Sequence, residues 1–290
     1  MKLARYWTRG EAEASDSNGE QIRVRARGWS DESVDQARAR ALEVARRVAQ
    51  RLSSVDGGAK ERYPYGDRPL PEPILREFRD ARGELAAIVT RNVYGSLVLN
   101  ASRLMFVDVD RKEAGASAGQ ALGKMFSSLF GKKPADDAPA NDPVMDAMNR
   151  VVERHGLSAR VYETAGGHRI AITSAPFEPG SLVAQALLQE FDADPMFTRL
   201  CRTQESFRAR LTPKPWRCNL PCPPAAFPFE TTAEQERQQR WEAQYDSKTA
   251  SYATCRFLNA LGSGKVLAEF NELIQYHDHE TKSAHAVRLA

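Results

Sequence analysis

Hydrophobic and polar positions repeat with two different periods near the start of the chain. Alternation over residues 5–8 and 21–27, on either side of the turn-forming stretch Asp16-Ser-Asn-Gly, predicts a β-hairpin. Apolar positions three and four apart over 31–52 predict a long helix with Ser30 as its N-cap. The rest of that helix carries arginines, which form either a solvated face or a phosphate-contacting one: Arg38, Arg40, Arg46, Arg47 and Arg51.

The middle of the chain changes to β-type patterning and then loses its pattern. A short helix over 73–79 precedes apolar runs that predict strands at 86–91, 96–100 and 104–110. Residues 111–143 are rich in Gly, Ala, Ser, Lys, Asp and Pro, so we expect a flexible insertion there.

Helices and strands are mixed in the remainder. The expected elements are helices at 143–155, 181–191, 195–201, 233–261 and 265–276, and strands at 159–164, 168–173 and 206–212. Many short connections suit antiparallel neighbours, which predicts an α+β fold with a mixed or antiparallel sheet core, flanking helices and a helical C-terminal tail. We expect three parts: a hairpin and basic helix packed on the core (1–60), an α+β core (61–215), and a Pro/Cys connection with C-terminal helices (216–290).

Composition excludes some classes without naming a function. The chain has 290 residues with 42% hydrophobic and 27% charged residues, which excludes a fibrous or wholly disordered protein. A net charge of +3 is too small to indicate a nucleic-acid partner by itself. No apolar stretch is long enough to cross a bilayer, and residues 1–7 contain no apolar signal core. We therefore expect a cytoplasmic protein with no membrane partner.

Two aspartates end one of the predicted strands. In Leu104-Met-Phe-Val-Asp-Val-Asp the side chains of Asp108 and Asp110 project from the same face, because strand side chains alternate. Paired carboxylates are suitable ligands for a hard divalent cation such as Mg²⁺. Two solvated acids at a strand end explain the same residues.

A second stretch joins two strands through a glycine turn. In Tyr162-Glu-Thr-Ala-Gly-Gly-His the glycines allow a tight turn and close approach to a ligand, and His168 opens the return strand. A histidine there can hydrogen-bond a phosphate oxygen, or it can simply cap the turn.

Positive charge is dense in a third stretch. Between residues 199 and 217 six positive side chains face a single acid, Glu205. Arg208 and Arg210 share a strand face, and Lys214 adds a point charge that suits phosphate oxygens. Trp216 can stack on a base. An exposed basic strand is the alternative.

The order of these stretches resembles the archaeo-eukaryotic primase superfamily, and primase-polymerases in particular. Those proteins have an acidic D-x-D strand, a small-residue-x-His motif, a further acid, and then an arginine-bearing strand and a lysine. The matching residues are Asp108/Asp110, Gly166-Gly167-His168, Asp192 or Asp194, and Phe207-Arg208 through Lys214.

The resemblance implies a metal-dependent nucleotidyltransferase in DNA replication or repair, with nucleic acid and a nucleoside triphosphate as partners. It implies two Mg²⁺ or Mn²⁺ ions held by the acids, Asp108, Asp110, Asp192 and Asp194. It implies a nucleotide-binding set of His168, Gly167, Arg208, Arg210 and Lys214, with His168 and Asp194 also in the catalytic set.

Two alternative functions stay open. One is a non-catalytic nucleic-acid-binding or assembly module with a degenerate core, and the other is a metal-dependent phosphodiesterase or nuclease. The cysteines add a further candidate site: Cys218 and Cys222 have ligand-like spacing, and Cys201 and Cys255 can complete a structural Zn²⁺ site. Buried free thiols explain these cysteines as well.

Overall fold

The computed structural model describes residues 1–2, 4–15, 20–53, 69–111 and 143–290. Its main strands are β3 (Ile74–Arg79), β4 (Leu85–Arg91), β5 (Leu97–Ala101), β6 (Met105–Asp110), β7 (Ala159–Thr164), β8 (Gly167–Ile172), β9 (Phe207–Arg210) and β11 (Cys255–Leu261). They form two four-stranded sheets in the orders β11-β7-β8-β6 and β3-β4-β5-β9. All ladders of both sheets are antiparallel, and helices flank them, which confirms the α+β prediction.

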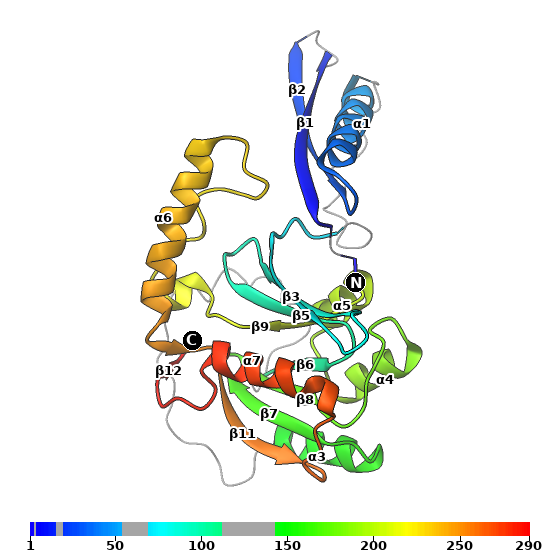
Figure 1. Ribbon diagram of the computed structural model, residues 1–290, viewed down its shortest axis with the longest axis vertical. Helices are drawn as coiled ribbons and strands as arrows, with labels where there is room; N and C mark the ends of the chain where they lie inside the picture. The colour runs from blue at the N-terminus through cyan, green and yellow to red at the C-terminus, as the bar shows by residue number, and fades with distance from the viewer. Residues whose placement is uncertain (3, 16–19, 54–68, 112–142) are drawn as a thin grey trace.

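Helices lie around these sheets, except that α1 lies beside the N-terminal hairpin (Figure 1). They are α1 (Val34–Ser53), α3 (Pro143–Arg154), α4 (Leu182–Glu190), α5 (Pro195–Gln204), α6 (Thr232–Thr249) and α7 (Asn271–Thr281), with 3₁₀ turns η1 (Pro215–Cys218) and η2 (Ala268–Phe270). None of the helices in the described part of the chain has the length and apolar character needed to cross a bilayer.

The two sheets share one hydrophobic core. Buried apolar side chains from β4 and β5 belong to the same cluster as those from β6, β7 and β8. The sheets meet where β6 contacts β9. α7 covers one face of the β11-β7-β8-β6 sheet, where the ring of His277 lies 5.2 Å from Phe106 and 4.9 Å from Tyr162. This face carries the first of the two aspartates at the end of β6.

The N-terminal part is a separate layer that projects from the body (Figure 1). β1 (Tyr6–Ser15) and β2 (Gln21–Ser30) form the predicted hairpin, and α1 packs on it through fully buried alanines, Ala37, Ala41 and Ala45. A Cβ on Gly28 would lie 2.0 Å from the carbonyl oxygen of Ala37, so only glycine permits this close approach. Helix α1 starts at Val34, and Ser33 accepts a hydrogen bond from the backbone of Gln36.

The helix predicted at 73–79 and the end of the helix predicted at 233–261 are strands. Residues 74–79 form β3, because pairing with β4 outweighs the weak helical preference of a six-residue run. Residues 255–261 form β11, which pairs with β7 as the edge of the sheet, so α6 ends at Thr249 and the C-terminal part completes the core. β10 (Tyr252–Ala253) and β12 (Arg288–Leu289) pair beside it. The expected flexible insertion lies outside the described residues, apart from its ends.

Candidate functional site

The two aspartates of the D-x-D stretch lie at the end of β6, on the face that the alternation predicts. β6 pairs with β8 so that Asp108 stands opposite Arg169 and Asp110 opposite Gly167. Arg169 grips the first carboxylate with two hydrogen bonds, Nε to Oδ1 at 2.8 Å and Nη2 to Oδ2 at 3.1 Å. The Arg169 side chain is 1% exposed and that of Asp108 is 33% exposed. Both oxygens of Asp108 are therefore already engaged by a buried cation.

Arg169 is itself held in place by a buried polar network. Its Nη1 donates to the backbone oxygen of Arg210 at 2.8 Å and approaches His277 Nε2 at 3.5 Å, and His277 Nδ1 lies 3.0 Å from Asp278 Oδ1. Burial works to lower the pKa of Arg169, but Asp108 holds that pKa above its ordinary value. Burial lowers the pKa of His277, which favours its neutral form. The Arg169–Asp108 pair is therefore held in one arrangement by hydrogen bonds to its surroundings.

The turn between α4 and α5 determines which candidate for the third acid, Asp192 or Asp194, lies near β6. Asp194 is the N-cap of α5, where its Oδ1 accepts from the Phe197 amide at 2.7 Å, and its own amide donates to the backbone oxygen of Asp108 at 3.2 Å. Asp194 therefore lies beside β6. Asp192 is an exposed residue with a φ of 57° on the preceding turn. The structure brings Asp194 to the aspartates of β6, and Asp194 sits at a helix end.

Three cations gather next to these carboxylates. Arg210 ends β9, Lys214 precedes η1, and Arg217 lies within η1. We call Arg210, Lys214 and Arg217 the cation triad. Among the described residues, no acceptor bonds the buried Nε of Arg210 or the buried Nη1 of Arg217. Buried donors without acceptors are costly, so they mark a place where an anion would be stabilised.

The pKa values of the triad also show that its buried positive charges are not fully stabilised by neighbouring groups. Burial, then repulsion from Arg169, lowers the pKa of Arg210 to about 10. Burial, then repulsion from Arg210 and Arg217, lowers the pKa of Lys214 to about 8. Burial also lowers the pKa of Arg217. In each case the charged form is less stable than in water, and a bound anion would reverse this.

Asp110 faces the triad from β6. Partial desolvation, followed by the neighbouring charges of Asp194 and Asp108, raises its pKa, and Lys214 and Arg210 oppose the rise. A Cβ added to Gly166 would lie 3.8 Å from both Asp110 Oδ1 and Arg217 Nη2, so the glycine turn runs past both groups. The geometry therefore brings part of the predicted set, the acids at the end of β6 and the cations after β9, to one place beside the glycine turn.

The triad is positioned by the segment between β9 and η1. Ser96 at the start of β5 donates to the backbone oxygen of Pro213 at 3.0 Å, and the Thr212 hydroxyl accepts from the Leu97 amide at 2.8 Å. The hydroxyl of Tyr245, from α6, donates to the same backbone oxygen of Pro213 at 2.5 Å. These bonds fix Lys214 relative to both the sheet and α6.

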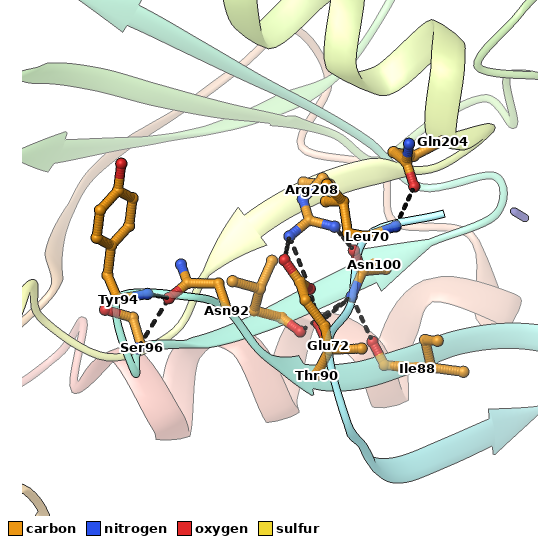
Figure 2. Close-up of polar contacts among 11 residues, drawn as sticks. Leu70, Glu72, Ile88, Thr90, Asn92, Tyr94, Ser96, Asn100, Gln204 and Arg208 are labelled. Atoms are coloured by element: carbon orange, nitrogen blue, oxygen red, sulfur yellow. Dashed lines mark hydrogen bonds and ion pairs between the residues drawn. The ribbon is translucent and has the colours of Figure 1, made fainter. Parts of the chain in front are cut away.

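Arg208, which the sequence places in the nucleotide-binding set, is used structurally. Its guanidinium donates to both oxygens of Glu72, at 2.8 and 3.0 Å, and to Asn100 Oδ1 at 2.7 Å (Figure 2). The side chains of Arg208 and Glu72 are only 7% and 6% exposed. Thr90 completes the network by donating to Glu72 at 2.5 Å. The prediction that Arg208 binds phosphate is not supported, because its donors already have buried acceptors.

His168 and Gly167 also have other places than the sequence suggests. The register pairs His168 with Val109 and Glu163, so its side chain points to the face of the sheet opposite Asp108 and Asp110. A Cβ on Gly167 would lie 2.1 Å from the Val109 carbonyl oxygen, so this glycine is needed for strand packing. The His168 side chain is therefore not brought into the cluster, whereas Gly167 lies beside Asp110 as its ladder partner.

The expected metal sites are not assembled among the residues described. That part of the chain contains no group of three or more His, Cys, Asp or Glu side chains placed to hold a metal ion. Cys201, Cys218 and Cys255 are buried free thiols and Cys222 is exposed. For a carboxylate-bound divalent cation, Asp108 has both oxygens on Arg169 and Asp194 has one on its helix. The donor set in this arrangement does not fit a two-metal centre.

Sequence reasoning missed Arg169 and gave Arg217 no role. The signal for Arg169 is a charged residue inside the otherwise apolar run of β8, which requires a buried partner. Its partner depends on the register of β6 and β8, which are far apart in sequence.

Comparison of the chain with family models, curated proteins and solved structures found no match.

Proposed function

We propose that the cation triad binds the phosphates of a nucleoside triphosphate and that the protein is a nucleotidyltransferase acting on a nucleic-acid end. The observation that carries this proposal is the set of buried, uncompensated donors on Arg210 and Arg217, with Lys214 between them in sequence. Guanidinium and ammonium groups in that arrangement bind phosphate oxygens strongly. The resemblance to primase-polymerases supplies the reaction.

Asp110 and the cation triad have roles in that reaction. An attacking hydroxyl oxygen forms a bond to the α-phosphorus, and the bond to the pyrophosphate oxygen breaks. Asp110 accepts the hydroxyl proton, for which its raised pKa makes it a stronger base. The triad stabilises the negative charge that develops on pyrophosphate. A Mg²⁺ or Mn²⁺ ion is the cofactor that the resemblance implies, but no step is assigned to it, because Asp108 is bound to Arg169.

The proposal is tested by binding and extension measured side by side. We expect the purified protein to bind inorganic tripolyphosphate and, with Mn²⁺, to add nucleotides to a labelled primer. Lys214→Met raises the KM for nucleotide, and Asp110→Asn abolishes extension with an unchanged circular dichroism spectrum. Lys248→Met, which removes an exposed lysine of α6, serves as the matched control. A protein that binds neither tripolyphosphate nor nucleotide overturns the proposal.

One observation favours a second function, a phosphate-binding module for nucleic acid without catalysis. The bidentate Arg169–Asp108 pair removes the first acid from any role as a ligand or base. In that case tripolyphosphate and single-stranded DNA bind with a steep salt dependence, Lys214→Met weakens both, and no primer is extended or shortened with any divalent cation. Shortening of the primer without nucleotides would instead indicate a nuclease.

A further inference from the structure

Two aromatic rings from distant parts of the sequence meet beside the cation triad. Tyr94 lies in the turn between β4 and β5, and Trp216 lies in η1. Their ring centroids are 5.3 Å apart, with an interplanar angle of 86°. Lys214 Nζ lies 5.4 Å from the centroid of Trp216, so a triad cation is in direct contact with the aromatic pair.

The turn that carries Tyr94 is held rigidly. Asn92 Oδ1 accepts hydrogen bonds from the amides of Tyr94 and Ser96, both at 3.0 Å (Figure 2). Gly95 has a φ of 88°, and a Cβ there would lie 2.1 Å from the ring of Trp241, so the turn is seated closely on α6. In Figure 2 the Tyr94 ring points away from the buried network around Glu72.

The turn that carries Tyr94 is hydrogen-bonded to the segment that carries Lys214. Ser96, the residue after Gly95, donates its hydroxyl to Pro213, one residue before Lys214. The relative position of Tyr94, Trp216 and Lys214 is therefore set by hydrogen bonds between the two segments, and it does not depend on the ring contact alone. Such support is typical of residues that must present a fixed surface.

Tyr94 is exposed and Trp216 is partly buried, so neither ring belongs to the buried core. The Tyr94 side chain is 39% exposed, and the adjacent Val93 is 68% exposed. In an edge-to-face pair at least one ring keeps its faces clear of the other ring. Aromatic faces beside clustered cations suit a ligand that is both flat and anionic, and they disfavour a cationic ligand of the kind that aromatic cages bind.

We infer that Tyr94 and Trp216 form a stacking surface for the base of the nucleotide whose phosphates bind the triad. This inference rests on the proposed function, because it takes Arg210, Lys214 and Arg217 as the phosphate-binding groups. Stacking is tolerant of base identity, since every base has an aromatic face. The pair therefore provides affinity for nucleotides over inorganic phosphates without selecting one base.

The test compares ATP with inorganic tripolyphosphate, which lacks the base, by titration calorimetry on the full-length protein. We expect the wild type to bind ATP about tenfold more tightly than tripolyphosphate. Tyr94→Leu should abolish most of this preference and leave the tripolyphosphate affinity unchanged, while Tyr94→Phe retains it. Trp216→Leu should also abolish the preference, and Trp216→Phe should retain it. Tyr6→Leu, at an exposed tyrosine of β1, is the matched control.

The outcomes separate the two proposals. Equal affinities for ATP and tripolyphosphate in the wild type, with binding that Lys214→Met weakens, would overturn the stacking surface and leave the phosphate site standing. A preference for ATP that survives Tyr94→Leu also overturns it, and this variant changes only an exposed turn residue, so misfolding does not obscure the result. No binding of tripolyphosphate to the wild type would overturn the proposed function itself.

Discussion

Two arginines of one four-residue strand have opposite surroundings. Arg208 of β9 is enclosed by Glu72 and Asn100, with a buried acceptor for each donor that its side chain presents to them. Arg210, two residues later, has a buried Nε with no acceptor among the residues described, and its closest charged neighbours include Arg169 and Arg217. The first arginine completes the core, and the second leaves unsatisfied donors at its edge.

Arg208 and Arg210 differ in whether the fold provides hydrogen-bond acceptors for their side chains. The density of positive charge along the sequence does not distinguish them, because both lie in the same basic stretch. A cation whose acceptors belong to the fold contributes to stability, and its donors are not free to bind a ligand. A cation that is desolvated without acceptors lowers stability and is poised to bind an anion. The four predictions below test this distinction, from the largest expected effect to the smallest.

Removing the acceptor of Arg208 should have the largest effect. Glu72→Ala leaves a buried guanidinium unpaired, so we expect the free energy of unfolding to fall by about 3–5 kcal/mol, measured by urea denaturation. The double variant Glu72→Met/Arg208→Met should recover most of that loss. Glu84→Ala, at an exposed glutamate in the turn between β3 and β4, is the control. A loss below about 1 kcal/mol for Glu72→Ala would contradict the structural role of the pair.

Removing a cation of the triad should act on binding and spare stability. Lys214→Met removes repulsion from Arg210 and Arg217, so the free energy of unfolding should stay the same or rise. Affinity for tripolyphosphate should fall at least tenfold, since a hydrogen bond to a charged group is worth about 1.5–3 kcal/mol. Unfolding that becomes easier by an amount similar to that of Glu72→Ala would remove the difference between the two regions.

The stability of the protein and its affinity for an anion, both of which depend on Lys214, should change with pH in opposite directions. The Lys214 pKa of about 8 lies below the ordinary value of 10.5, so the unfolded chain binds more protons between these values and stability should rise with pH across that window. Affinity for sulfate, whose charge is constant there, should fall as pH rises through about 8, because the ammonium is lost. Lys214→Met should remove the step in both curves, and a step that persists in that variant would contradict the assignment.

The smallest effect is expected for Asp110 in the absence of divalent cations. Asp110→Asn removes a negative charge that opposes a bound anion, so sulfate affinity in EDTA should rise by up to about fivefold, or ~1 kcal/mol. Fluorescence or calorimetric titration measures this. A clear fall in affinity would mean that Asp110 holds the triad in place, and its role as the proton acceptor would then need revision.

Much of the local structure was predictable from the sequence. The alternation in the first thirty residues and the glycine turn before His168 predict the two hairpins, and the periodicity of α3 predicts that helix. The helix predicted at 73–79 was wrong because the short run contains residues compatible with both states, and a partner strand decided between them. Of the candidate site residues, the structure brings Asp108, Asp110 and Asp194 together with Arg210 and Lys214, and it leaves Asp192 outside.

The sequence by itself determined the α+β class, the shared face of Asp108 and Asp110, and the dense positive charge that follows α5, because these depend on period, alternation and composition. Only the tertiary structure decided that Arg169 pairs with Asp108 and that Glu72 pairs with Arg208. It also decided that the His168 side chain lies on the face of the sheet opposite Asp108 and Asp110. The positions of Arg169 and His168 depend on the register between β6 and β8, which lie far apart along the chain, and a shift of one residue would send every side chain to the other face. Glu72 reaches Arg208 from the segment before β3, across an even longer stretch of chain.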